Sequence, residues 1–147
     1  MVPLFVLVLT FGILRCAGFL GVAPLNNADL PLRIALFLMF LLTASAHWGR
    51  GRPDLVRMVP PALPHAATIV TITGVLEILG AIGLLLHPTI RLAAICLAIL
   101  LLALFPANIR AAREHLTIMG RPAPGLLVRG AIQVVFLAAL IFVGFYR

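Results

Sequence analysis

The sequence is organised around one apolar stretch with a single carboxylate at its centre, Thr71-Ile-Thr-Gly-Val-Leu-Glu-Ile-Leu-Gly-Ala-Ile-Gly83. With its apolar flanks it covers residues 66–86, and at about 1.5 Å per residue such a helix crosses the ~30 Å core of a bilayer. A carboxylate at that depth is unfavourable unless it faces protein or water and finds a partner. Gly74 and Gly80 lie one turn from Glu77, so a neighbouring helix can approach closely on this face.

Composition assigns the chain to the membrane. Hydrophobic residues make up 63% of it and charged residues 10%, whereas a soluble domain carries roughly half and a quarter. The net charge of +7 comes from basic residues that are all arginine. Because most arginines stand at the ends of apolar segments, we expect them to set topology and contact lipid headgroups. The lipid bilayer is therefore an expected partner, and nucleic acid is not.

We predict a single transmembrane domain over residues 1–147, an all-α polytopic helix bundle with five spans. Its helices are expected at residues 2–23, 32–48, 66–86, 91–109 and 126–146. The first segment has features of a signal peptide, but it starts without Arg and Arg15 interrupts its apolar run, which favours a retained span. In the fourth segment Pro106 removes a backbone donor, and we expect the helix to kink there.

Polar side chains from all five segments are expected in the half of the membrane next to the basic loops. They are Arg15, His47, Thr73, Glu77, Asn108, Arg129 and Gln133. The plain interpretation is a set of contacts between helices, stabilising by about 0.6 kcal/mol each. The alternative is a proton-handling or ligand-polarising pocket around Glu77.

Helix rise gives an expected partner for Glu77. Arg15 comes close to its depth, whereas Arg129 is about 12 Å shallower along the helix axis. Depth therefore favours an ion pair between Arg15 and Glu77, with Gln133, His47 or Thr73 as secondary partners.

Other chemistry has weaker support. The four histidines show no i, i+4 pairing and no cysteine spacing typical of a metal site, so no metal is expected. A redox pair of Cys16 and Cys96 is an alternative to two ordinary core cysteines, although there is no Cys-x-x-Cys. No phosphate loop, serine nucleophile motif or dinucleotide fingerprint is present, and the sequence leaves open whether the chain is an enzyme.

An ordered set of short motifs runs through most of the chain. It comprises Arg33-Ile-Ala-Leu-Phe-Leu, Ala46-His47-Trp48, Arg57-Met-Val-Pro-Pro-Ala-Leu-Pro64, Thr73-Gly-Val-Leu-Glu77, Arg91-Leu-Ala-Ala94 and Phe105-Pro-Ala-Asn108. This set resembles the DoxX-like family of small bacterial integral membrane proteins over about residues 33–135. Members often have Arg-Leu-Pro-Leu-Gln in the last helix, whereas this chain has Arg129-Gly-Ala-Ile-Gln133 and shares only the first and last residues of the motif. Members also usually have a Phe at the position of Trp48.

The resemblance implies a four-helix DoxX-like core with segment 2–23 as an extra N-terminal helix. A four-helix core that is stable without that helix must supply the partner of Glu77 from one of its own helices. This favours Arg129 over Arg15, so the two arguments conflict and the partner of Glu77 stays open. Some relatives are subunits of thiosulfate:quinone or quinol oxidoreductases or partners of redox enzymes. The resemblance thus implies a non-catalytic or accessory subunit of a quinone-linked membrane redox system, with a redox or membrane protein as partner.

No cofactor is evident in the sequence itself. The implied quinone-linked redox role makes a quinone a possible cofactor. Two other functions stay open. One is a structural or assembly membrane protein without a redox role, and the less favoured one is a small transporter or proton path.

The distribution of arginine predicts the orientation in the inner (plasma) membrane, with the N-terminus cytoplasmic and the C-terminus outside. One side of the membrane would hold Arg50, Arg52, Arg57, Arg110, Arg113 and Arg121, and the other Arg33, Arg91 and Arg147. Reporter fusions at Tyr146 and within residues 113–121 check this. We expect an extracytoplasmic signal at Tyr146 and a cytoplasmic signal in the loop, and the opposite signal at either site contradicts the prediction.

Overall fold

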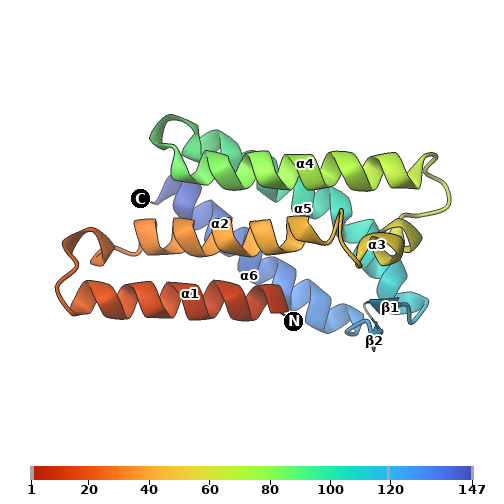
Figure 1. Cartoon of the computed structure of the whole chain (residues 1–147), viewed down its shortest axis with the longest axis horizontal. Coiled ribbons are helices and arrows are strands. Elements are labelled where there is room, and N and C mark those ends of the chain that lie inside the picture. Colours follow the sequence, from red (N-terminus) through yellow and green to blue (C-terminus); the bar gives the residue numbers. More distant parts are fainter. Residues whose placement is uncertain (1, 119, 147) are drawn as a thin grey trace.

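The chain forms a bundle of long helices joined by short turns (Figure 1), seen in a computed structural model that describes residues 2–118 and 120–146 except the side chain of Arg121. The helices are α1 (Val2–Phe19), α2 (Asp29–Ser45), α3 (Arg52–Met58), α4 (Ala66–Leu85), α5 (Ile90–Arg113) and α6 (Leu126–Phe145), with 3₁₀ turns η1 (Ala23–Leu25) and η2 (His87–Thr89). Strands β1 (Thr117–Ile118) and β2 (Arg121–Pro122) form a short antiparallel pair between α5 and α6. The predicted all-α class is confirmed.

Among the described residues, four helical segments are long and apolar enough to cross a membrane. They are α1, α4, α6 and the segment from His87 to Arg113 that contains α5. Helix α2 does not meet this measure, since its 17 residues fall short of the required length. Four candidate spans are therefore established, and the fifth stays a prediction. Arg147, which entered the charge asymmetry, lies outside the described residues, as does the side chain of Arg121.

Helices α2 and α5 differ from the predicted bounds: α2 has the predicted length but runs from Asp29 to Ser45 instead of 32–48, and α5 is longer than predicted. Helix α2 begins at Asp29, whose carboxylate lies in the first turn, where the positive end of the helix dipole favours it. Helix α5 continues through Pro106 and ends at Arg113 instead of residue 109. A proline removes only one backbone donor, and beyond it Arg110 Nε contacts Glu114 Oε1 at 2.9 Å, which supports the final turn.

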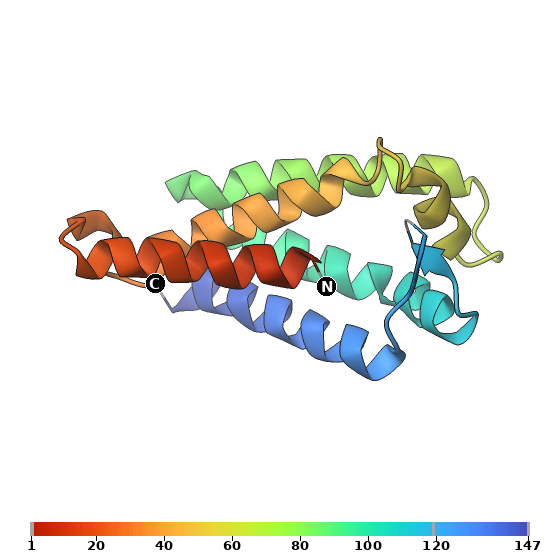
Figure 2. The same cartoon turned by 60° about the horizontal axis from the view of Figure 1, so that its bottom comes forward.

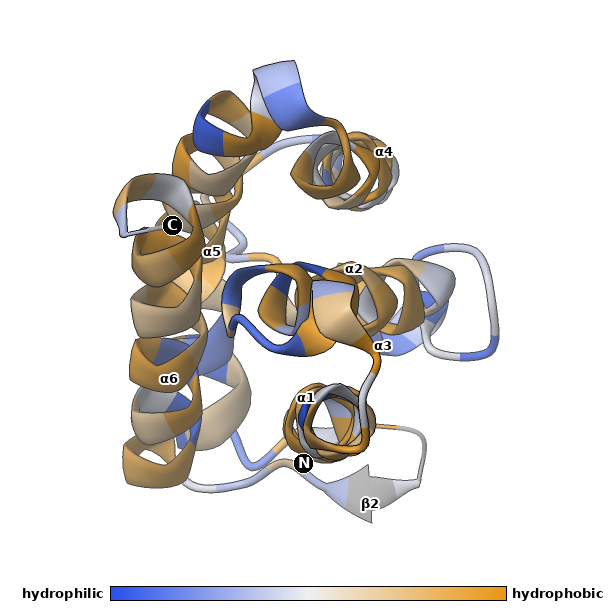
Figure 3. Cartoon of the chain, turned by 90° about the vertical axis from the view of Figure 1, so that its left-hand side faces the viewer, coloured by the Kyte–Doolittle hydropathy of each residue, from blue (hydrophilic) through white to orange (hydrophobic). Residues whose placement is uncertain are grey.

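Helix α2 is the centre of the bundle. It packs against α1 on one side and α4 on the other, and α4, α5 and α6 then follow one another around it. The end-on view shows α2 between α1 and α4 (Figure 3). Its buried apolar residues include Leu36, Met39 and Phe40, each at most 1% exposed. One face of α2 is buried against other helices and includes Arg33, whereas Leu38 and Leu42 on another face are exposed, so the buried polar residue contacts protein and not lipid.

The two ends of the bundle differ in structure. Helix α3 and the strand pair gather at the end where α4 begins and α5 ends (Figure 2). The α1–α2 and α4–α5 turns and the C-terminus lie at the opposite end (Figure 1). For brevity, the first is called the α3 end and the second the C-terminal end.

Glycines let α4 come close to both of its neighbours. A Cβ added at Gly74 would lie 2.7 Å from His47 Cβ, after the end of α2. A Cβ added at Gly80 would lie 2.5 Å from the side chain of Leu97 on α5. Small residues at helix contacts are the usual means of close packing in membranes, where the hydrophobic effect does not drive helices together. Helix α4 is thus held tightly between α2 and α5.

The side chain of Arg33, on α2, closes the C-terminal end of α4. Its Nε donates to the carbonyl of Leu84 at 2.7 Å, and its Nη2 donates to the carbonyl of Leu85 at 2.9 Å. Its Nη1 also lies 3.3 Å from Asp29 Oδ2. The last carbonyls of a helix lack intrahelical donors and carry partial negative charge, so a buried guanidinium stabilises them.

Replacing Arg33 by Leu should lower the free energy of unfolding by on the order of 3 kcal/mol, because two helix-end carbonyls and Asp29 lose their buried partner. Denaturant titration of the purified chain in detergent measures this change. The matched control is Arg50→Leu, since Arg50 is exposed in the turn before α3. Equal effects of the two substitutions would contradict the role given to Arg33.

Candidate functional site

The carboxylate of Glu77 is buried between α4 and α2. Its side chain is 6% exposed, and each oxygen faces a different group of the α2 segment. Oε2 accepts a hydrogen bond from Thr43 Oγ1 at 2.8 Å. Oε1 lies 3.6 Å from Nε2 of His47, which follows the end of α2. The sequence thus places this carboxylate inside the protein, and the partners that satisfy it come from one neighbouring helix and the turn after it.

The hydrogen bonds of His47 assign its tautomer. Nδ1 lies 2.5 Å from the carbonyl oxygen of Val70 on α4, and a carbonyl can only accept, so Nδ1 carries a proton. Thr73 Oγ1, 3.5 Å from Nδ1, donates to the carbonyls of Ile69 and Val70. Nε2 lies 3.6 Å from Glu77 Oε1, beyond hydrogen-bond distance, so the ring and the carboxylate face each other without sharing a hydrogen bond.

Arg52, at the start of α3, fixes the backbone next to this pair. Its Nη1 donates to the carbonyl of His47 at 2.7 Å. Its Nη2 donates to Thr71 Oγ1 at 2.9 Å and to the carbonyl of Ala67 at 3.1 Å, both on α4. One guanidinium therefore ties the turn after α2 to the first turns of α4, and His47 is held over Glu77.

Thr43 and Arg52 are not among the site residues predicted from the sequence. Thr43 stands four residues before His47, and this spacing on a helix puts both on the face that Glu77 contacts. That signal was available from the sequence. The sequence does not indicate that Arg52 contacts His47, because an arginine in a basic loop is ordinarily a topology determinant.

Three of the predicted polar residues form a second group between α5 and α6. Arg129 Nη1 donates to Asn108 Oδ1 at 2.5 Å, and its Nε donates to the carbonyl of Pro124 at 3.3 Å. Gln133 Nε2 donates to the carbonyl of Leu101 on α5 at 3.1 Å, in the turn before Pro106. Pro106 removes the backbone donor to the carbonyl of Leu102, and Gln133 donates to the adjacent carbonyl of Leu101. This group does not include Glu77.

The predicted ion pair of Arg15 with Glu77 does not form. Arg15 Nη1 donates to the carbonyls of Leu25 and Asn26 in the α1–α2 connector, at 2.9 Å for Leu25. Its guanidinium also lies over the ring of Phe19, 4.6 Å from the centroid. The physical reason is the helix order, because α2 lies between α1 and α4 (Figure 3). Equal depth in the membrane does not make two residues neighbours. Arg129, the alternative partner, contacts Asn108 instead.

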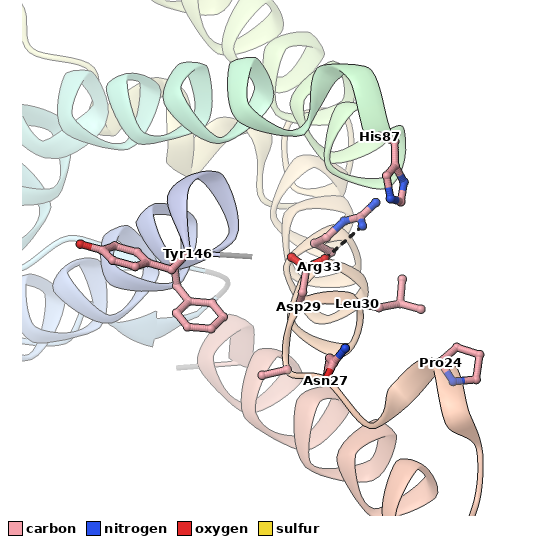
Figure 4. Close-up of a pocket in the computed structure, with 9 residues that line it drawn as sticks. Pro24, Asn27, Asp29, Leu30, Arg33, His87 and Tyr146 are labelled. Atoms are coloured by element: carbon pink, nitrogen blue, oxygen red, sulfur yellow. Dashed lines mark hydrogen bonds and ion pairs between the residues drawn. The ribbon is translucent and has the colours of Figure 1, made fainter.

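A polar depression of about 510 Å³ lies at the C-terminal end. It is lined by Pro24, Asn27, Ala28, Asp29, Leu30, Arg33, His87, Phe142 and Tyr146. In the close-up, Asp29 and Arg33 face each other on α2, while the phenol of Tyr146 points away from them (Figure 4). The donors of Arg33 already serve the end of α4, so the depression surrounds a structural contact.

The cysteines and histidines show no further site in the described part of the chain. Cys16 and Cys96 are free and exposed. Among the described residues, no three His, Cys, Asp or Glu side chains gather as a metal site would require.

Together, the apolar helices and the enclosed Glu77–His47 contact define a helical membrane protein that satisfies its polar side chains between its own helices. The sequence matches the profile of a family described as "Domain of unknown function (DUF8561)" over residues 36–144, and the chain belongs to that family. No curated protein and no solved structure matches it.

The identification as a DoxX-like protein is therefore wrong. Its motifs were short combinations such as an arginine at the start of a helix, small residues around Glu77 and a proline near a helix end. Any membrane bundle uses these devices, so they do not separate one family from another.

Double-mutant cycles test the contacts of Glu77. We expect Glu77→Leu and Thr43→Val to be coupled by on the order of 1 kcal/mol in the free energy of unfolding, because each substitution removes one partner of the hydrogen bond that the two side chains share. Glu77→Gln and Arg15→Ala should be additive, because α2 separates them. Denaturant titrations of the four chains in each cycle give both values. Additivity with Thr43, or coupling with Arg15, would contradict the assignment.

Proposed function

We propose that the chain is a non-catalytic membrane protein of structural or assembly type, a stable helix bundle that presents an apolar outer surface to lipid and to a membrane partner. The observation that supports this most is the enclosure of Glu77, both of whose carboxylate oxygens face groups of the α2 segment. Arg33, Arg129 and Gln133 likewise contact backbone or side chains of a neighbouring helix or connecting loop. Polar side chains used in this way stabilise the bundle.

We also propose that α2 crosses the membrane, which gives five spans. It packs along both α1 and α4, to which it is joined by the η1 connector and by the segment that contains α3. Its 17 residues extend about 26 Å, close to the thickness of the hydrocarbon core. Helix α2 tolerates Asp29 and Arg33 because Arg33 is buried against α4 and the two side chains pair with each other. The N-in, C-out orientation in the inner membrane belongs to the same proposal.

The accessory role in a quinone-linked redox system stays a prediction, and no contact described above supports it. It came from the family resemblance that the comparisons overturn. Identifying proteins that co-purify with the solubilised full chain separates the two roles. A dehydrogenase or sulfur-oxidising enzyme would support the redox role, and an unrelated membrane protein would support the assembly role.

One observation favours a second function, a proton path. His47 Nε2 and Glu77 Oε1 lie 3.6 Å apart, and imidazole and carboxyl groups are the kinds of side chain that form proton relays in membranes. A path also needs access from both sides of the membrane. The polar depression at the C-terminal end does not include either residue in its lining. The assembly role therefore has the stronger support.

Proton flux into liposomes that contain the purified chain tests the choice. Under a pH gradient we expect the same flux as in protein-free liposomes, because Glu77 is enclosed by protein. A flux above that level that Glu77→Gln abolishes would overturn the assembly role and establish the proton path. Glu114→Gln is the control, since Glu114 is exposed at the end of α5.

A further inference from the structure

A narrow apolar groove runs between α5 and α6 near the C-terminal end. It encloses about 140 Å³ and is lined by Ala94, Ile95, Ala98, Ile99, Leu102, Leu140, Ile141 and Phe145. The helices approach each other closely at its end, where a Cβ added at Gly144 would lie 3.1 Å from Ala94 Cβ. Alanines at positions 94 and 98 leave a furrow between larger side chains, and several of these, including Ile99 and Ile141, are exposed on the outer surface.

The positively charged side chain of Arg91 lies at one end of this groove. The guanidinium of Arg91 lies over the ring of Phe145, 4.8 Å from its centroid, and Phe145 is itself part of the groove wall. Arg91 is the second residue of α5 and is exposed. The ring holds the positive charge beside the opening of the groove.

The dimensions match one leaflet of a bilayer. From Arg91 to Leu102 the helix rises about 16 Å, close to half of the ~30 Å hydrocarbon core. Arg91 then lies at headgroup level, and the groove below it reaches the middle of the membrane. A phospholipid has the same arrangement, with a phosphate at the surface and an acyl chain directed inward.

We propose that this groove is a binding site for an anionic phospholipid, with its acyl chain between α5 and α6 and its phosphate beside Arg91. Charge complementarity selects an anionic lipid over a zwitterionic one. The wholly apolar lining selects an acyl chain over a polar ligand. This site is separate from the Glu77–His47 contact, and its occupation does not depend on the function proposed above.

Native mass spectrometry of the detergent-solubilised full chain tests this site, with phosphatidylglycerol and phosphatidylcholine as probes. We expect preferential retention of phosphatidylglycerol. Arg91→Gln should weaken its binding about fivefold, since one arginine near the surface contributes about that factor. Arg91→Lys keeps the charge and should retain most of the binding. Ala98→Phe fills the furrow and should reduce binding of phosphatidylglycerol strongly.

Two controls match these changes. Arg113→Gln removes an exposed arginine at the α3 end, and Leu79→Phe adds an aromatic ring on the exposed face of α4. Both should leave lipid retention unchanged. The proposal is overturned if Arg113→Gln weakens binding as much as Arg91→Gln, or if Ala98→Phe has no effect. It is also overturned if the wild-type chain is a dimer that Ala98→Phe dissociates, because the groove would then hold a second copy.

Discussion

Lipid offers no hydrogen bonds, so the carboxylate of Glu77 determines how the centre of this bundle is assembled. A charged group at that depth must be enclosed and partnered. Thr43 and His47 meet this requirement from the α2 segment, and Gly74 allows the close approach that their distances need. The face of α4 that turns toward α2 is therefore fixed by one side chain. Because α4 also packs on α5, and α5 on α6, the placement of α5 and α6 depends on how α4 packs against α2.

The same constraint explains the remaining polar contacts. Arg33 supplies donors to the last carbonyls of α4, Gln133 supplies one to α5 near Pro106, and Arg129 pairs with Asn108. Each joins two elements that are neighbours in the bundle. These contacts run from the C-terminal end to the loop that precedes α6, so the bundle is held along its length. A membrane protein gains little from apolar burial between helices, and such contacts with close packing supply its specificity.

The sequence predicts the long apolar helices well because hydropathy and length respond directly to the bilayer. It also predicts that Glu77 needs a partner. It does not identify that partner, because the depth of Arg15 and of His47 is a coordinate along the membrane normal, whereas contact depends on the order of helices around the bundle. Arg33 shows the same limit. Its position at the start of an apolar segment predicts an arginine at the membrane surface. In the structure it is buried against the carbonyl of Leu84, some fifty residues away in the sequence. Helix α2 was correctly predicted to be a helix. Its start at Asp29 was not predicted, because the polar first turn does not appear in the hydropathy pattern.

The distance between His47 and Glu77 in a bilayer tests the central claim most directly. Glu77 and Glu114 are the two glutamates of the chain, so the Glu114→Gln variant leaves one. Solid-state NMR of that variant, with ¹³C in the glutamate carboxyl and ¹⁵N in the histidine rings, reports their dipolar coupling. The Nε2–Oε1 distance of 3.6 Å predicts a clear coupling to one histidine, which His47→Phe removes. Absence of any coupling, or a coupling that survives His47→Phe, would contradict the account.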